Sequence, residues 1–215
     1  MCIRDRYCTK LLSGLGADVI KVERLDTGDG VRWLGPFASG TQVTVGNQAP
    51  EDGAWFLYLN TAKQSLALDL KSYEGRRVVL ELAARADILV ENFAPGGIDS
   101  IGLSYTELEK ANPALVVTSI SNFGQTGPKR KLPGYDAVVQ AEGGLMSITG
   151  PRDGTSYRLG VAIADIVSGM FAAQGITLAL LSRERTGRGQ LVDIAMLDSV
   201  AVSYTHLTLP TSDLV

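Results

Sequence analysis

Apolar residues along the chain fall into two patterns, short β-branched runs and longer stretches with helical spacing. The runs at 17–23, 87–92 and 115–120 predict strands, and the last is continuously apolar or β-branched, as is typical of a parallel strand covered on both faces. Ser72 and Ser104 each precede a helical stretch as a capping residue would. Strands that alternate with helices predict an α/β fold, a Rossmann-like parallel sheet flanked by helices.

The predicted elements cover most of the chain. We predict strands at 17–23, 65–70, 87–92, 115–120 and 190–194. We predict helices at 7–15, 72–86, 104–111, 135–146, 161–181 and 195–202. Residues 33–53 are rich in Gly, Pro, Ser and Thr, which predicts a long exposed loop of the kind that is often functional.

The helix predicted at 161–181 is apolar in almost every turn, and small residues are interleaved where another backbone could approach. Asp165 stands at its front with no basic residue within four positions on either side. A carboxylate in such surroundings needs a physical reason. One reason is an N-cap or first-turn acid, satisfied by free helix amides and favoured by the helix dipole. The other is a nucleophile that the same amides keep ionised. The helical periodicity favours the capping role, and composition does not distinguish the capping role from the nucleophilic one.

Composition excludes several classes of function. The 215 residues carry a formal net charge of −3, which argues against nucleic-acid binding because such proteins usually have a basic excess. We find no apolar run long and uncharged enough for a membrane span. Cys2 and Cys8 lie close together with no partners elsewhere, so we expect no disulfide framework, no metal site and a reducing, cytoplasmic compartment. A zinc site or a Ser-His-Asp triad would need His206, the only histidine.

Both ends of the chain differ from the rest. Residues 1–6 have no apolar period, and residues 203–215 interrupt a helical pattern without a cap. Both resemble translated adapter sequence, so we expect 1–6 and 203–215 to be non-native and exclude them from the fold. The expected domain is then 7–202, truncated, and the native protein is expected to be longer in both directions. His206 and Cys2 leave the catalytic inventory.

Polar and basic residues follow the predicted strands. In an open parallel sheet, ligands bind beyond the carboxyl ends of the strands. This rule selects Arg24, 69–71, 92–94 and 122–124. Arg24 and Lys71 could hold phosphates, and Phe93 could pack on a ring or a thioalkyl arm; taken singly, each residue could equally just end a strand. Because neither G-x-G-x-x-G nor a Walker motif is found, nothing indicates NAD or ATP.

Six spaced motifs together resemble one known family, the class III CoA-transferases (CaiB/BaiF, formyl-CoA-transferase-like). The resemblance covers residues 7 to about 202. The motifs are GADVIKVER with GD and R downstream, NTAKQSLALDLKSYEGR, ADILVENFAPGGIDSIGL, NPALVVTSISNFGQTGP, GYDAVVQAEGGLMSITG and IADIVSGMFAAQGITLALLSRERTGRGQLVDIAMLD.

The resemblance implies a function and a set of site residues. Asp165 would be the nucleophile that attacks an acyl-CoA thioester, passing through a mixed anhydride to an aspartyl-CoA thioester, from which an acceptor carboxylate collects CoA. CoA and acyl-CoA would be substrates, with no permanently bound cofactor and no metal. Family members are usually interlocked homodimers with a large Rossmann-like domain and a small domain. The implied CoA-binding residues are Arg24, Leu68, Asp69, Leu70, Lys71, Asn92, Phe93, Ala94, Gly134, Tyr135 and Asp136.

The chain departs from the family pattern at several places. Ser100 stands where relatives often have a CoA-binding arginine, and Pro133 where some have a lysine. The first strand of the family fold would fall where residues 1–6 stand. The small domain and a glycine-rich loop would lie beyond Val202. The resemblance therefore implies roughly half of a family protein.

Two alternatives remain beside CoA transfer. An acyl-CoA racemase of the same superfamily would use a His/Asp acid–base pair with the histidine near Tyr135. The segment here is Pro-Gly-Tyr-Asp, which favours transfer. The third possibility is an inactive fragment that binds CoA weakly or not at all.

Overall fold

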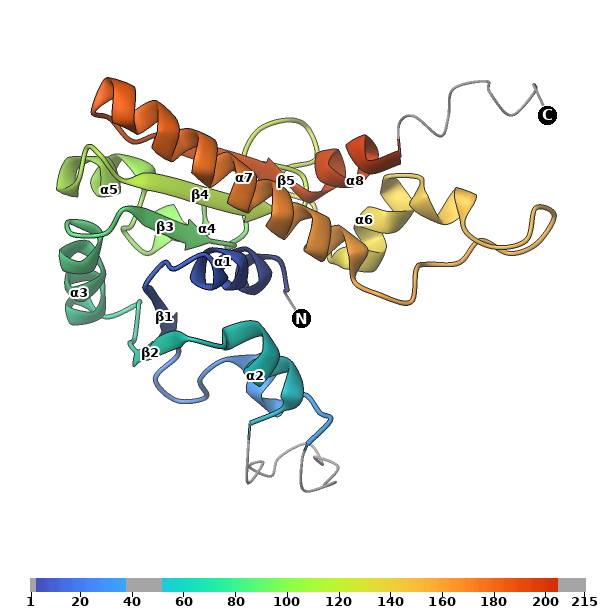
Figure 1. The fold of residues 1–215 in the computed structure, drawn as a ribbon, viewed down its shortest axis with the longest axis horizontal. Coiled ribbons are helices and arrows are strands. Elements are labelled where there is room, and N and C mark those ends of the chain that lie inside the picture. The colour runs from blue at the N-terminus through green and yellow to red at the C-terminus, as the bar shows by residue number, and fades with distance from the viewer. Residues whose placement is uncertain (1–2, 38–51, 205–215) are drawn as a thin grey trace.

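The computed structural model describes residues 3–37 and 52–204, and it has the predicted architecture of parallel strands flanked by helices (Figure 1). The first half of the chain contains α1 (Arg4–Gly14), β1 (Val19–Glu23), η1 (Gly30–Trp33), α2 (Ala54–Asn60), β2 (Lys63–Ala67), α3 (Tyr73–Ala83), β3 (Ile88–Glu91), α4 (Gly97–Ser100) and α5 (Tyr105–Ala111). The second half contains β4 (Val116–Ser121), α6 (Asp136–Glu142), η2 (Leu145–Ile148), α7 (Ile163–Thr186), β5 (Leu191–Ala195) and α8 (Met196–Tyr204).

The strands form two parallel sheets. In one, β1 pairs with β2, and in the other the order is β3-β4-β5. A doubly wound sheet has the spatial order 3-2-1-4-5-6. In that order β2 and β1 would occupy the first two places and β3, β4 and β5 the last three. Within the described residues, no strand fills the remaining place between β1 and β3. We expected the first strand of the family fold where residues 1–6 stand, but residues 4–6 belong to α1.

The helix α7 organises the core. It runs along β4 and β5 and contacts α1 and α8 (Figure 1). Ala172 and Ile176 of α7 are buried against Cys8 of α1 and Ile120 of β4. The backbones of α1 and α7 approach closely, because a Cβ built on Gly169 would lie 2.8 Å from the carbonyl oxygen of Arg4. The small residues of this helix therefore permit the close approach that the sequence predicts.

By length and composition alone, α7 could span a membrane, contrary to the sequence analysis, which found no sufficiently apolar run. The helix nevertheless makes the contacts of a core helix, which passes the same test because its apolar side chains face other protein segments. Its contacts with α1, α8, β4 and β5 account for its buried apolar residues, such as Ala172 and Ile176, whereas Met170, Leu178 and Leu181 are exposed.

The predicted first helix begins too late. We expected it at residue 7, but α1 begins at Arg4, and both Ile3 and Arg4 are buried. Excluding residues 3–6 from the fold was therefore wrong, because a segment too short to show helical periodicity can still continue a helix. That these residues are non-native stays a prediction. At the other end, α8 continues through Tyr204, two residues past the expected boundary, and residues 205–215 lie outside the described part.

The prediction for residues 55–70 missed a helix. α2 spans only seven residues before β2, too few to establish a 3.6-residue period. The predicted helix starts at Ser72 and Ser104 are confirmed, since each hydroxyl accepts a hydrogen bond from a backbone N–H three residues later. The loop predicted at 33–53 lies largely outside the described residues.

Candidate active site

Asp165 lies in the first turn of α7 and is buried, with 2% of its surface exposed. Its Oδ2 accepts a hydrogen bond of 3.3 Å from the backbone N–H of Ile3, and its Oδ1 lies 4.0 Å from Nη1 of Arg4. The predicted first-turn position is correct. The predicted partners are not, because the hydrogen bond and the counter-charge come from the start of α1 rather than from the amides of its own helix.

Arg4 supplies the positive charge that the neighbouring sequence lacks. Its Nη1 donates a 2.8 Å hydrogen bond to Oδ1 of Asn122 and also contacts Sδ of Met196. Asn122 directly follows β4, and Met196 begins α8. The guanidinium is thus held at the carboxyl end of the sheet, where the strand-end rule placed the ligand site. Arg4 could not be predicted as a site residue because residues 1–6 were excluded from the fold.

Asp136 is the second carboxylate of the site. Its Oδ2 accepts a 3.1 Å hydrogen bond from the backbone N–H of Asp165. The start of α6 is fixed in turn by Asn122, whose Nδ2 donates to the carbonyl oxygen of Gly134 at 2.9 Å. Of the three adjacent residues proposed for CoA binding, Asp136 is buried, while Tyr135 is 63% exposed. The structure therefore brings Asp136 to the nucleophile candidate, and it connects Gly134 to Asn122, the partner of Arg4.

Burial raises the pKa of the Asp165 carboxyl to about 6. The Arg4 guanidinium and the Ile3 N–H lower this pKa, whereas the charges of Asp136 and Asp5 raise it further. The carboxyl is still mostly ionised at neutral pH, as a nucleophile requires. The sequence led us to expect that helix amides keep this carboxyl ionised. The structure shows instead that burial raises its pKa, and the pKa stays low enough for ionisation at neutral pH.

Asp165→Asn should stabilise the fold at neutral pH. Because the folded-state pKa lies above the usual value of 3.8, the stability linked to this group is complete below that value and is lost as the pH rises through about 6. The substitution should raise the free energy of unfolding by about 1–3 kcal/mol at neutral pH and by much less in acid. Urea unfolding at both pH values measures this, with exposed Asp198→Asn as control. A gain confined to acid would contradict it.

The residues proposed to bind CoA lie at two edges. Arg24 follows β1 and is exposed, and its guanidinium pairs with Asp26 at 3.2 Å. The segment 68–71 follows β2, and Leu68 N–H donates to the carbonyl oxygen of Glu23 at 2.9 Å. These two groups therefore share the carboxyl edge of the β1–β2 sheet. Among the described residues, neither group forms a hydrogen bond or an ion pair with Asp165.

The other proposed residues follow β3. Asn92 Nδ2 donates to Oδ1 of Asp5 at 2.9 Å, which places Asn92 beside α1 and close to Arg4. Phe93 is partly exposed, as a residue that packs on a ligand would be, and its N–H donates to Glu91 at 2.7 Å. The edge after β3 and β4 thus holds Asn92 and Asn122, both linked to the first turns of α1.

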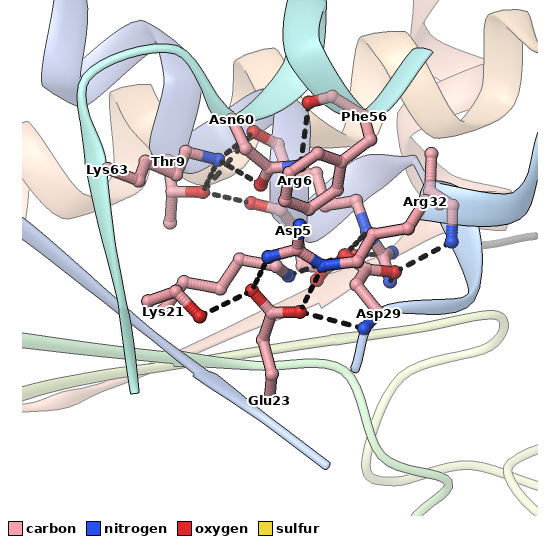
Figure 2. A network of polar contacts seen from close by, with 12 residues as sticks. Asp5, Arg6, Thr9, Lys21, Glu23, Asp29, Arg32, Phe56, Asn60 and Lys63 are labelled. Carbon is pink, nitrogen blue, oxygen red and sulfur yellow. Dashed lines mark hydrogen bonds and ion pairs between the residues drawn. The ribbon is translucent and has the colours of Figure 1, made fainter. Parts of the chain in front are cut away.

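The motif VIKVE with GD and R downstream forms a buried ion-pair network (Figure 2). Both carboxylate oxygens of Glu23 accept hydrogen bonds from Arg32, at 2.9 and 2.8 Å. Asp29 pairs with Arg6 at 2.6 Å and with Lys21 at 2.6 Å. Because each charge is matched within the network, these residues hold the loop after β1 rather than present charge to a ligand.

Lys63 occupies the far side of this network. Its Nζ donates to the carbonyl oxygen of Arg6, to Oγ1 of Thr9 and to Oδ1 of Asn60, at 2.9, 2.8 and 3.3 Å (Figure 2). Burial lowers the pKa of Lys63 to about 8, with the charge of Lys21 acting in the same direction. Lys63 therefore joins β2 and α2 to α1 and has a structural role.

A cavity of about 410 Å³ lies on the face of β4 opposite α7. It is lined by Ile98, Tyr105, Val117 and Leu191, with Arg130 and Lys131 from the loop between β4 and α6. Asp165 does not line it, and its apolar wall continues the cluster of Leu108 and Val117. The cavity is therefore separate from the Asp165 carboxylate.

Fold and site together define an α/β protein with a buried, ionisable aspartate at the carboxyl edge of parallel strands. The chain belongs to CoA-transferase family III, whose family model matches residues 3–211. That match includes positions at both ends that the sequence analysis set aside, and their origin stays a prediction.

Curated relatives and solved structures agree with this assignment. The chain is 42% identical over 201 residues to succinyl-CoA:glutarate CoA-transferase from Mus musculus, covering 94% of this chain and 44% of the relative. It is 41% identical to acetyl-CoA:oxalate CoA-transferase from Acetobacter aceti, covering 93% and 49%. A CaiB/BaiF family protein from Brucella suis superimposes with a TM-score of 0.86 at 37% identity, over 97% of this chain and 53% of that one. The chain thus spans about half the length of the relatives it matches.

Proposed function

We propose that the complete protein transfers CoA between an acyl-CoA and a carboxylic acid acceptor, with Asp165 as the nucleophile. The observation that carries the proposal is a buried carboxylate whose pKa of about 6 leaves it ionised at neutral pH, at the carboxyl edge of the sheet. Family membership supports it, because the relatives are named CoA-transferases for several acyl pairs.

The proposed reaction balances as two exchanges through the same carboxylate. A carboxylate oxygen of Asp165 attacks the thioester carbonyl, and CoA leaves as a thiolate, giving an acyl-aspartyl anhydride. The thiolate then attacks the aspartyl carbonyl, which forms an aspartyl-CoA thioester and releases the donor acid. The acceptor carboxylate attacks this thioester and expels the thiolate, and the thiolate takes the acyl group from the new anhydride, which regenerates Asp165.

Access to Asp165 sets a condition on this mechanism. Ile3 and Arg4 cover the carboxylate, so a thioester reaches it only after these two residues move away. Arg4 also stabilises the ionised carboxylate, and its departure would leave a more basic nucleophile. The same opening would thus expose the carboxylate and increase its reactivity.

CoA would lie along the strand ends, with Arg24 and Lys71 on phosphates and Phe93 against the ring or the pantetheine arm. Asn92 and the backbone of Leu68, Asp69, Leu70 and Ala94 would line the path toward Asp165. Ser100 and Pro133 do not offer the charges found in relatives, so Lys129, Arg130 and Lys131 are the alternative phosphate contacts. We also propose an interlocked homodimer for the complete protein and a cytoplasmic location.

Arg24→Ala should weaken CoA binding by about 1.5–3 kcal/mol, because the exposed guanidinium would lose a charge-assisted hydrogen bond to phosphate. Calorimetric titration with CoA measures the change. Arg77→Ala is the matched control, since Arg77 is an exposed arginine that pairs only with Glu74 and Glu81 on its own helix among the described contacts. Unchanged affinity of the Arg24 variant would move the phosphate site to Lys71 or the 129–131 run.

One experiment tests the function against its alternatives. The protein is incubated with an acyl-CoA without acceptor, and intact mass and peptide mapping locate any adduct. Transfer predicts a CoA thioester or an acyl group on Asp165. A racemase would leave the protein unmodified and exchange the α-proton of the substrate, and an inactive fragment would do neither. An unmodified Asp165 in a protein that turns over would contradict the proposal.

A further inference from the structure

Gln140 is a fully buried residue that lies one turn into α6. It has no role in the function proposed above. Its Nε2 donates to Oδ1 of Asp136 and, at 3.3 Å, to the carbonyl oxygen of Val161. Its Oε1 accepts a 2.9 Å hydrogen bond from the N–H of Leu159. Both ends of the amide are therefore used, and they join α6 to the segment that leads into α7.

The second oxygen of Asp136 completes the connection to the candidate nucleophile. Oδ2 accepts from the backbone N–H of Asp165, while Oδ1 accepts from Gln140. The residue that caps α7, Ala162, provides no side-chain hydrogen bond, so the first turn of α7 takes this acceptor from another helix. Residues 159–165 are consequently fixed to α6 at three points.

We propose that Gln140 is a positioning residue for Asp165: it orients the Asp136 carboxylate and the 159–161 segment, so that the first turn of α7 presents its carboxylate at one fixed place. This inference rests on the proposed role of Asp165 as nucleophile. Gln140 does not touch the reacting atoms. It acts through Asp136 and through the backbone that enters α7.

A neutral amide suits position 140. One end donates to a carboxylate while the other accepts from an N–H, and an amide keeps both functions across the pH range, whereas a carboxyl group donates only when it is protonated. Methionine of similar length would leave Leu159 N–H and Asp136 Oδ1 without partners. An ionised glutamate would accept but not donate, and it would repel Asp136.

Gln140→Glu therefore makes the connection depend on pH. The introduced carboxyl group can still donate to Asp136 when it is protonated, whereas it cannot when it is ionised. The charged groups that act on Asp165 include Arg4 and Asp5 of α1 and Asp136 of α6. Gln140→Glu leaves these groups unchanged and adds one carboxyl group beside Asp136.

The test follows the Asp165 amide in ¹⁵N-labelled protein by hydrogen exchange. Gln140→Met should reduce protection of this amide about tenfold or more at every pH, because its acceptor is no longer held. Gln140→Glu should keep protection near about pH 5 and lose it near about pH 8. Thr118→Val, which alters a fully buried hydroxyl away from the site, should leave this amide as in the wild type. Protection equal to wild type in both Gln140 variants at both pH values would overturn the proposal.

Activity of the complete protein gives the second readout. The kcat of Gln140→Glu relative to wild type should approach one in acid and fall about tenfold or more in mild base, with KM for acyl-CoA little changed. A KM change alone would assign Gln140 to substrate binding and overturn positioning. If Gln140→Met does not fold, the protection of the Asp165 amide in Gln140→Glu at the two pH values still tests the proposal. If wild type forms no adduct and transfers no CoA, the proposed function fails, while the amide exchange still reports on the connection.

Discussion

Asp165→Ala is expected to reduce CoA transfer by about 10⁴-fold or more, the scale reached when a covalent nucleophile is removed. Asp136, the other carboxylate that contacts Asp165 within the described residues, is not expected to replace it, because both of its oxygens accept hydrogen bonds, from the backbone N–H of Asp165 and the side-chain amide of Gln140. CoA should still bind, since Arg24 and residues 68–71 lie on other elements. Steady-state transfer and calorimetric CoA binding measure the two effects separately.

The control for this substitution is Asp198→Ala, which removes an exposed first-turn acid from α8. It tests whether losing any acid near a helix N-terminus lowers activity, and it should leave transfer unchanged. Asp165→Asn adds a variant of equal shape that keeps an acceptor for the Ile3 N–H. Transfer at the wild-type rate in either Asp165 variant would remove Asp165 from the mechanism.

The position of Asp165 could be predicted from sequence because it depends on local features. A carboxylate isolated from basic residues at the front of an apolar helix is visible in a single stretch, and it lies in the first turn of α7 as predicted. Its partners could not be predicted in this way. Arg4 and Asn122 are distant in sequence, and they meet only because α1 packs on α7 beside the end of β4.

The hydrogen bonds of Gln140 also could not be predicted from sequence, although its partners are closer to it along the chain. Its place within an apolar helical stretch gave no indication of three hydrogen bonds, because its partners 159 and 161 lie in a loop whose path periodicity does not determine. The strand-end rule was more informative, since it depends on topology. It placed Asn92 and Asn122 at one edge of the sheet, where the structure connects both to α1.

The first strand–loop motif was recognised only by resemblance, and the structure supplies its physical reason. Lys21, Glu23, Asp29 and Arg32 match one another's charges beneath the loop. Alternation along β1 could not reveal this, because a charged residue in a strand ordinarily predicts an exposed position. The pairing depends on the tertiary fold, in which residues 29–32 fold back on β1.

Glu23→Ala is expected to lower the free energy of unfolding by about 1–3 kcal/mol, because it leaves partly buried donors without the buried carboxylate that accepts from them. The donors lost are both nitrogens of the Arg32 fork, the hydroxyl of Ser65 at 2.8 Å and the N–H of Asp29 at 2.8 Å. Arg32 also lies over the Phe56 ring, so its displacement would disturb the packing of α2. Glu23→Gln should cost less, since it keeps an acceptor of the same shape.

The pH dependence distinguishes a lost charge from lost packing. Burial alone would raise the pKa of Glu23, but hydrogen bonds from Arg32 and Ser65 outweigh it and hold the pKa below its usual 4.5. The stability from this group is therefore present above pH 4.5 and is lost as the pH falls through the lower folded-state value. The difference between wild type and Glu23→Gln in urea unfolding should accordingly shrink in acid. Glu74→Gln, which removes an exposed carboxylate paired with Arg77, should leave the unfolding midpoint unchanged. A difference that stays constant from neutral pH into strong acid would show that Glu23 stabilises the loop by packing rather than by its charge.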